Sequence, residues 1–437
     1  MRKSLSLFFV LLFLLPLVTY HTAQARVYID VTKPFSRKLP LALPEFQALE
    51  QTAPIGAKAR GILQKDLEFT GLFDFLNPNS FLGQPDPTNL NYRRWSRVGA
   101  ELLVTGNYGL VGKQLTMEMR LFDVVDGKLL VGRRYDGIPA DLTRMMHRFA
   151  DEIMLALTGD RSVFSSRIAF VGARQDDKGV NKEIYTMNFD GSRVRKLTNR
   201  KDICLYPNWS SDGGLLAYTS YKNRRPGVFI HAMAGGQGKM VINKPGVNIT
   251  PVFRPGGNNL AIAMSHTGKT NIFLVDLAGN ILKRLTNGWG IEVAPSFSPD
   301  GKKMAFVSDR GGSPQIYIAD LTDGSFRRLT FGFKYCAAPD WSPRGDRIAF
   351  QAMIEGTFQV VTITPEGQDV QILTRGYGGA EDPSWSPDGR LIAYAGRRTG
   401  RYQIYVMTAG GQLIKRLTSL AGENTDPSWS PRGVAGR

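Results

Sequence analysis

Few residues in this sequence are of a type and spacing that could perform chemistry. The chain has four histidines and two cysteines among 437 residues. His231 and His266 have no Cys, Asp or Glu nearby at the spacing of metal ligands. There is no G-x-S-x-G elbow, no P-loop, no G-x-G-x-x-G after a strand and no H-E-x-x-H. We therefore expect a protein that is not an enzyme and that holds no metal and no cofactor.

The three later histidines are expected to have structural roles. His147 lies between Arg144 and Arg148, off the apolar stripe of its helical segment, so we expect its side chain to be solvated. His231 and His266 are more simply explained as structural histidines than as ligands. The carboxylates are spread through turns, and no pair is singled out as a general acid and base.

Residues 1–25 are predicted to be a secretory signal peptide. A basic start precedes an apolar stretch at 5–18, and Ala23-Gln24-Ala25 fits the small-residue rule of a cleavage site. A transmembrane anchor is the alternative, but the apolar run falls short of the ~20 residues that a spanning helix needs. We expect cleavage before Arg26 and a soluble mature protein outside the cytoplasm.

The net charge is strongly basic. The formal charge is +17, and removal of Arg2 and Lys3 with the signal peptide leaves +15. For an exported protein, this charge points to anionic envelope material or an acidic protein partner rather than to nucleic acid. A role in solubility alone is almost as good an explanation.

An internal repeat dominates the C-terminal two thirds of the chain. Each copy has a proline, one intervening residue and an aromatic residue, and each of these prolines lies 44 positions after the previous one. The six anchors are Pro207/Trp209, Pro251/Phe253, Pro295/Phe297, Pro339/Trp341, Pro383/Trp385 and Pro427/Trp429. A turn of the type Ser298-Pro299-Asp300-Gly301 follows the aromatic residue, and three short apolar or β-branched runs complete the copy. Four short strands in about 44 residues are typical of a β-propeller blade.

The two ends of the repeat are complementary. The first second-strand sequence, Ile168-Ala169-Phe170, has no anchor before it, and the last anchor, at Pro427, has no second strand after it. We therefore predict six blades in a ring that the C-terminal strand closes, which removes open sheet edges. Cys204 and Cys336 lie three repeats apart, on opposite sides of such a ring and beyond the ~7 Å limit for a disulfide. Both are expected to be free thiols.

Basic pairs recur on the fourth strand of the repeat. Lys283-Arg284, Arg327-Arg328 and Lys415-Arg416 occupy equivalent positions. Protection of the outer edge against strand pairing is the preferred explanation, with ligand binding as the alternative.

Residues 26–160 lack the repeat and are predicted to form a small α+β domain, followed by the all-β propeller at 161–437. A strand is expected at 39–46, in an edge position because it contains Pro40 and Pro44. Thr52 is expected to cap a helix that ends at Gly71. Asp126-Gly127 is expected to form the turn of a β-hairpin. A second helix is expected between a cap at Asp141 and a stop at Gly159, with a Met-containing stripe that packs in the core.

The chain after residue 25 resembles the TolB family over essentially its whole length. The resemblance lies in the order of the domains, in the helix that ends Leu157-Thr158-Gly159 and in Arg167-Ile168-Ala169-Phe170-Val171, which opens the six blades. Ser308-Asp309-Arg310-Gly311-Gly312 leading into Gln315-Ile316-Tyr317 is also typical of these repeats.

This resemblance implies a monomeric periplasmic protein of the Tol-Pal system, with a role in outer-membrane integrity and in constriction during cell division. It implies that one propeller face binds the peptidoglycan-associated lipoprotein Pal, and that the N-terminal region binds TolA-like inner-membrane Tol proteins. Membranes would be reached through these partners only, and no nucleic acid would be bound. In similar proteins the Pal face consists of the loops that enter the anchor strands and the loops between the second and third strands. Here these loops carry Tyr206, Asn248, Thr250, Glu292, Arg310, Tyr335, Glu381, Asp382, Thr425 and Asp426. The N-terminal contact would comprise Arg26, Val27, Tyr28, Ile29, Asp30, Val31, Thr32 and Lys33.

Two other functions are compatible with an exported propeller. One is an enzyme-associated propeller, which the missing nucleophile motif disfavours. The other is a module that binds peptidoglycan or another carbohydrate, which the net charge and the channel-facing aromatic residues favour.

Overall fold

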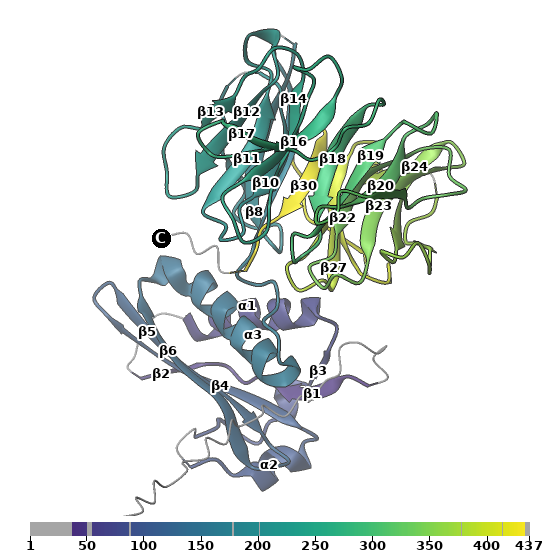
Figure 1. The fold of residues 1–437 in the computed structure, drawn as a ribbon. Helices are drawn as coiled ribbons and strands as arrows, with labels where there is room; N and C mark the ends of the chain where they lie inside the picture. The colour runs from purple at the N-terminus through teal and green to yellow at the C-terminus, as the bar shows by residue number, and fades with distance from the viewer. Residues whose placement is uncertain are drawn as a thin grey trace, which may run out of the picture.

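The computed structural model describes residues 37–49, 55–86, 89–176, 179–200, 202–376, 378–412 and 414–432. The predicted signal peptide, the segment at 26–33 and Thr52 lie outside these ranges. An N-terminal α+β domain is followed by a six-bladed β-propeller, as predicted (Figure 1). No helix in the described ranges is long and apolar enough to cross a membrane.

The N-terminal domain is built on one sheet with the strand order β3-β1-β4-β5-β6, to which β2 adds by pairing with β4. Its strands are β1 (Leu39–Ala42), β2 (Gln47–Ala48), β3 (Phe73–Phe75), β4 (Leu102–Val111), β5 (Gln114–Asp123) and β6 (Lys128–Gly137). Its helices are α1 (Ile55–Phe69), α2 (Tyr92–Arg97) and α3 (Leu142–Thr158), with the 3-10 turns η1 (Pro78–Ser80) and η2 (Pro139–Asp141). Figure 1 shows α1 and α3 between this sheet and the propeller.

The predicted edge position of the first strand is wrong. β1 lies inside the sheet, parallel to β3 on one side and to β4 on the other. Pro40 is tolerated because pairing with β4 begins only at Leu41, so its missing N–H removes no ladder bond. Its carbonyl still accepts a hydrogen bond from the N–H of Glu101 at 3.1 Å.

The two long helices are amphipathic in the way the sequence predicts. The Met-containing stripe of α3 is fully buried, which confirms its role in the core, and Gly159 ends the helix in the left-handed conformation with φ 78°. Asp141 does precede α3, but its carboxylate accepts the N–H of Ile138 at 3.1 Å and makes no cap hydrogen bond to the helix.

His147 is buried, and the expectation that its side chain is solvated is wrong. Its Nδ1 lies 2.7 Å from Oδ2 of Asp66 on α1, and Phe189 of the propeller packs edge-on at 5.2 Å between ring centroids. Burial raises the pKa of Asp66 to about 6. Burial also lowers the pKa of His147, but the hydrogen bond and charge of Asp66 outweigh it and raise that pKa above its usual value. The propeller thus covers a helix face that would be exposed in an isolated domain.

The propeller has six four-stranded antiparallel sheets, and the C-terminal strand closes the ring as predicted. The closing sheet has the order β30 (Asn424–Trp429), β7 (Arg167–Asp176), β8 (Gly179–Asn188) and β9 (Arg195–Lys196). The other blades are β10–β13 (Cys204–Trp209, Leu215–Ser220, Gly227–Ala232, Lys239–Ile242), β14–β17 (Asn248–Phe253, Leu260–Met264, Asn271–Val275, Ile281–Arg284), β18–β21 (Glu292–Phe297, Lys303–Ser308, Gln315–Asp320, Phe326–Arg328), β22–β25 (Cys336–Trp341, Ile348–Ile354, Thr357–Ile363, Gln371–Ile372) and β26–β29 (Ala380–Trp385, Leu391–Gly396, Gln403–Thr408, Ile414–Arg416). A single 3-10 turn in the described part of the propeller, η3 (Lys222–Arg224), joins β11 to β12.

Neighbouring blades are joined by hydrogen bonds from the anchor aromatic residues. The residue between proline and aromatic accepts the backbone N–H of the aromatic residue in the next blade, at 2.7–3.0 Å, in four blades. The acceptors are Asn208, Ser296, Asp340 and Ser384. The anchor sequence therefore joins each of these blades to the next as well as forming its innermost strand.

Both cysteines are free and buried, which confirms the prediction from the repeat. Burial raises the pKa of the Cys204 thiol to about 11 and that of Cys336 to about 12.

We expect neither thiol to react with 5,5′-dithiobis(2-nitrobenzoic acid) at pH 8 in the folded protein. Both should react once the chain is unfolded in 6 M guanidinium chloride, because the thiolate is the reactive form and burial suppresses it. Rapid release of one equivalent of thionitrobenzoate from the native protein would contradict this result.

Candidate partner-binding face

Each innermost strand of the propeller contains a bulge at the residue before its anchor proline. These six residues have positive φ angles of 47–56°, and the register shifts at each of them. They are Tyr206, Thr250, Ala294, Ala338, Asp382 and Asp426. A residue before proline normally prefers extended backbone, so this conformation stores strain on the order of 1–3 kcal/mol at each position. The surrounding ring holds six equivalent strained residues in place.

The six bulges meet around the axis of the propeller. Together with the following proline and its neighbour in each blade, they line a cavity of about 140 Å³. Four predicted partner-binding residues are thereby brought together: Tyr206, Thr250, Asp382 and Asp426. The repeat spacing places residues that are 44 positions apart at equivalent points around one channel.

Asp382 and Asp426 lie close together in this cavity. Burial raises the pKa of Asp382 well above its usual value, and the charges of Asp426 and Glu381 raise it further. Burial also raises the pKa of Asp426, although hydrogen bonds from Asp382 and from the backbone of Tyr206 act in the opposite direction. Burial and the proximity of the two carboxyl groups therefore disfavour the state in which both are ionised.

Asp340 is a third carboxyl group in the cavity, and the sequence did not single it out. Its Oδ2 accepts the backbone N–H of Trp385 at 2.7 Å, and the hydroxyl of Ser296 lies 3.5 Å from Oδ1. Burial raises its pKa to about 7. One sequence feature could have identified Asp340: it lies between the anchor proline and the aromatic residue, where polar side chains recur in other blades.

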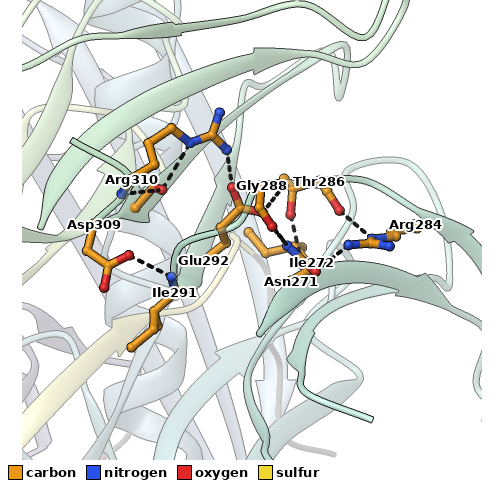
Figure 2. Close-up of polar contacts among 10 residues, drawn as sticks. Asn271, Ile272, Arg284, Thr286, Gly288, Ile291, Glu292, Asp309 and Arg310 are labelled. Atoms are coloured by element: carbon orange, nitrogen blue, oxygen red, sulfur yellow. Dashed lines mark hydrogen bonds and ion pairs between the residues drawn. The ribbon is translucent and has the colours of Figure 1, made fainter. Parts of the chain in front are cut away.

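Glu292 is fully buried and is the centre of the polar network in Figure 2. Its carboxylate accepts hydrogen bonds from Asn271 Nδ2 at 2.7 Å and from the backbone N–H of Gly288 at 3.1 Å, and it forms an ion pair with Arg310. A Cβ at Gly288 would lie 2.0 Å from Glu292 Oε1, so this contact requires glycine.

The same network holds the loop that leads into β18. Asp309 accepts the N–H of Ile291 at 2.6 Å, and Arg284 binds Asn271 Oδ1 at 2.5 Å (Figure 2). Arg310 also stacks over Phe326, with its guanidinium carbon 4.7 Å from the ring centroid. Glu292 and Arg310 therefore fix the shape of the loop at 287–291.

The remaining predicted residues of this face have partners within the propeller. Asn248 is fully buried and donates to the carbonyls of Lys244 and Pro226 at 2.7 and 3.1 Å. Glu381 accepts the hydroxyl of Tyr402, and Thr425 pairs with Val171 in the closing sheet.

The accessible residues of this face include an apolar and aromatic group, beside exposed basic residues such as Lys222, Lys334 and Arg397. Tyr206 and Tyr335 have 37% and 38% of their surface exposed. Trp289, Ile291 and Phe331 lie on the loops that enter β18 and β22 and are 74%, 56% and 67% exposed. Sequence reasoning missed these three, although their position on the same entering loops as Glu292 and Tyr335 could have identified them.

This face lies at the end of the propeller away from the N-terminal domain. The turns that follow the anchor aromatic residues point toward that domain, and Asp388 of one such turn lies 3.5 Å from the hydroxyl of Ser162 in the linker. The entering loops are at the opposite ends of the same strands. Within the described residues, no group of three or more His, Cys, Asp or Glu side chains could hold a metal ion.

Known families match both domains of the chain, and a known structure resembles the whole fold. Residues 155–434 match the TolB beta propeller domain family and residues 27–130 the TolB amino-terminal domain family. Over 91% of this chain and 97% of the other, the structure resembles the crystal structure of TolB from Acinetobacter baumannii, with a TM-score of 0.79 and 28% identity.

Curated relatives with the name Tol-Pal system protein TolB are similar over part of their length. The protein of Desulfosudis oleivorans is 42% identical over 48% of this chain and 49% of its own. That of Syntrophotalea carbinolica is 39% identical over 46% and 47%. The chain thus spans about half the length of the curated relatives it matches, and these relatives are named for a system rather than for a reaction.

Proposed function

The chain belongs to the TolB family, and from this premise we propose that it is a periplasmic, non-enzymatic binding protein of the Tol-Pal system. The propeller face described above binds a Pal-type peptidoglycan-associated lipoprotein. An N-terminal segment at 26–33, which would follow the cleavage site of a signal peptide at 1–25, binds inner-membrane Tol proteins of the TolA type. The protein thereby supports outer-membrane integrity and constriction during cell division.

One observation supports the choice of face above all others. The entering loops gather exposed tyrosine, tryptophan and phenylalanine side chains around a cavity that is lined by three carboxyl groups whose pKa values are raised by burial. Aromatic anchors surrounded by polar groups are typical of residues that carry most of the binding energy at protein interfaces. Since this face points away from the N-terminal domain, a partner bound to it would leave that domain accessible.

The face is tested by removing its exposed tyrosines. In a pull-down from a detergent-solubilised envelope extract of the source organism, the wild-type protein should recover a Pal-type lipoprotein. Tyr206→Ala/Tyr335→Ala should weaken its binding at least tenfold, since truncation of a central aromatic residue costs about 2 kcal/mol. Glu292→Arg is a poorer choice, because it would disrupt a buried ion pair and reshape a loop rather than remove a contact.

Ile281→Ala/Leu282→Ala is the matched control. It removes exposed apolar surface from the outer strand β17, away from the face, and should leave recovery unchanged. Equal recovery by both variants would place the lipoprotein elsewhere on the chain. If an extract that contains the lipoprotein gives none with the wild type, and the protein instead sediments with purified peptidoglycan, carbohydrate binding replaces the proposal.

A further inference from the structure

A second cavity lies between the two domains and is not used by the proposed function. It has a volume of about 580 Å³, within the usual range of ligand pockets. Its walls come from β6 and α3 of the N-terminal domain, from the linker and from β7–β9 of the propeller. It is lined by seven arginines, Arg133, Arg144, Arg148, Arg161, Arg167, Arg193 and Arg195, and by only three acidic residues, Asp141, Asp151 and Glu152.

We call this cavity the arginine cleft. Its three acidic side chains already form ion pairs or hydrogen bonds with neighbouring residues. Glu152 pairs with both Arg133 and Arg161, the latter at 2.8 Å. Asp141 pairs with Arg144 at 2.9 Å. The carboxylate of Asp151 accepts the backbone N–H groups of Phe164 and Ser165 in the linker, at 3.2 and 3.0 Å.

Four of the seven arginines have no carboxylate partner in the described part of the chain, and one of these, Arg193, donates to a backbone carbonyl instead. Within the described residues, Arg148 on α3, Arg167 at the start of β7 and Arg195 on β9 form no ion pair. Arg167 is half-buried, and burial and the nearby charges of Arg195 and Arg193 lower the pKa of its guanidinium. Like charges are therefore crowded on the propeller wall, and Arg148 adds another on the opposite wall.

The two walls are nevertheless held together. Arg193 of the propeller donates to the carbonyl of Ala140 in the N-terminal domain at 3.0 Å, across the mouth of the cleft. The packing of Phe189 against α1 and α3 fixes the same junction. The excess positive charge is thus maintained in a defined cleft rather than dispersed by separation of the domains.

We propose that the arginine cleft binds a ligand that carries two or more phosphate groups. Guanidinium groups bind phosphate through paired, charge-assisted hydrogen bonds. The arginines without a carboxylate partner come from both walls and carry more positive charge than a single phosphate neutralises, whereas linked phosphates carry a matching negative charge. Both a soluble oligophosphate and the headgroup of a phospholipid with two phosphates have this chemistry. The proposal does not depend on lipoprotein binding at the distant propeller face.

The test is calorimetric titration of the secreted protein with sodium tripolyphosphate at 150 mM NaCl. Tripolyphosphate should bind at least tenfold more tightly than orthophosphate. Arg148→Gln/Arg195→Gln should weaken this binding at least tenfold. Both side chains are exposed, so the substitutions are compatible with folding.

Lys239→Gln/Lys283→Gln is the control, because it removes two exposed charges from outer strands far from the cleft. It should change the dissociation constant for tripolyphosphate less than twofold.

Co-sedimentation with vesicles that contain cardiolipin in phosphatidylcholine distinguishes a lipid headgroup from a soluble oligophosphate. Loss of vesicle binding in the arginine variant alone assigns a lipid headgroup, and tripolyphosphate binding without vesicle binding assigns a soluble ligand.

Three results would overturn the proposal. The first is equal weakening in the arginine and lysine variants, which would indicate only a general effect of net charge. The second is equally tight binding of hexaglutamate, which would indicate an acidic protein segment as the occupant. The third is the absence of saturable binding of both tripolyphosphate and cardiolipin vesicles to the wild type.

Discussion

Trp429→Ala is expected to lower the free energy of unfolding by about 3–5 kcal/mol, the usual cost of truncating a large buried aromatic side chain. Trp429 ends β30, the strand that closes the ring, and only 7% of its surface is exposed. Its indole Nε1 donates to the hydroxyl of Ser166 at 2.8 Å, and its backbone N–H donates to Ser384 at 3.0 Å. The substitution removes the packing of the indole and its hydrogen bond to Ser166 at the start of the first blade, whereas the backbone hydrogen bond to Ser384 remains.

Urea unfolding followed by far-ultraviolet circular dichroism measures this change without depending on tryptophan fluorescence. Trp289→Ala is the control, since the same substitution at a side chain that is 74% exposed should change the free energy by less than about 0.5 kcal/mol. A cost below 1 kcal/mol for Trp429→Ala would mean that the closing strand is held by its backbone ladder with β7 rather than by this side chain.

Asp340→Asn is expected to make the protein more stable above neutral pH. The pKa of Asp340 is raised to about 7 by burial, so its ionised form is disfavoured in the folded state. Between pH 3.8 and 7 the folded chain binds this proton more tightly than the unfolded chain, so stability falls as pH rises through this window. The asparagine cannot ionise, and its amide oxygen can still accept the N–H of Trp385.

The difference in unfolding free energy between variant and wild type should be near zero at pH 4 and roughly 2–4 kcal/mol at pH 8. Asp382 and Asp426 titrate in both proteins, so the difference between the two curves isolates Asp340. Asp300→Asn is the control: hydrogen bonds from Ser298 and Lys302 hold the pKa of Asp300 below its usual value, outside this window. Parallel curves for wild type and Asp340→Asn between pH 4 and 8 would contradict the prediction.

The blades could be predicted because the residues that specify each turn and strand lie close together in the sequence. Proline and glycine restrict the backbone at the turns, and alternating apolar runs define strands over a few residues. The 44-residue spacing then gave the number of blades, and the incomplete copies at Ile168 and Pro427 predicted the closure. The same register predicted that Cys204 and Cys336 are unpaired.

The accessibility of site residues could not be predicted in this way. Glu292 and Tyr335 lie on or beside equivalent entering loops, yet one is fully buried and the other is 38% exposed. The two residues are one position apart in the repeat: Glu292 is equivalent to the buried Cys336, and Tyr335 is equivalent to the exposed Ile291. What one copy of the repeat does not record is that a charged residue at this buried position is paired, because Asn271 and Arg310 come from a neighbouring strand and loop.

The sequence by itself determined the two-domain architecture, the six blades, their closure and the face to which the anchor loops contribute. Only the tertiary structure decided that His147 is buried, that Asp340 joins the axial cavity and that arginines from both domains form one cleft. The physical reason is the distance along the chain over which each interaction acts. Turn and strand preferences act between neighbours in the chain, whereas burial and charge crowding depend on surfaces that come together when the propeller closes and packs against α1 and α3.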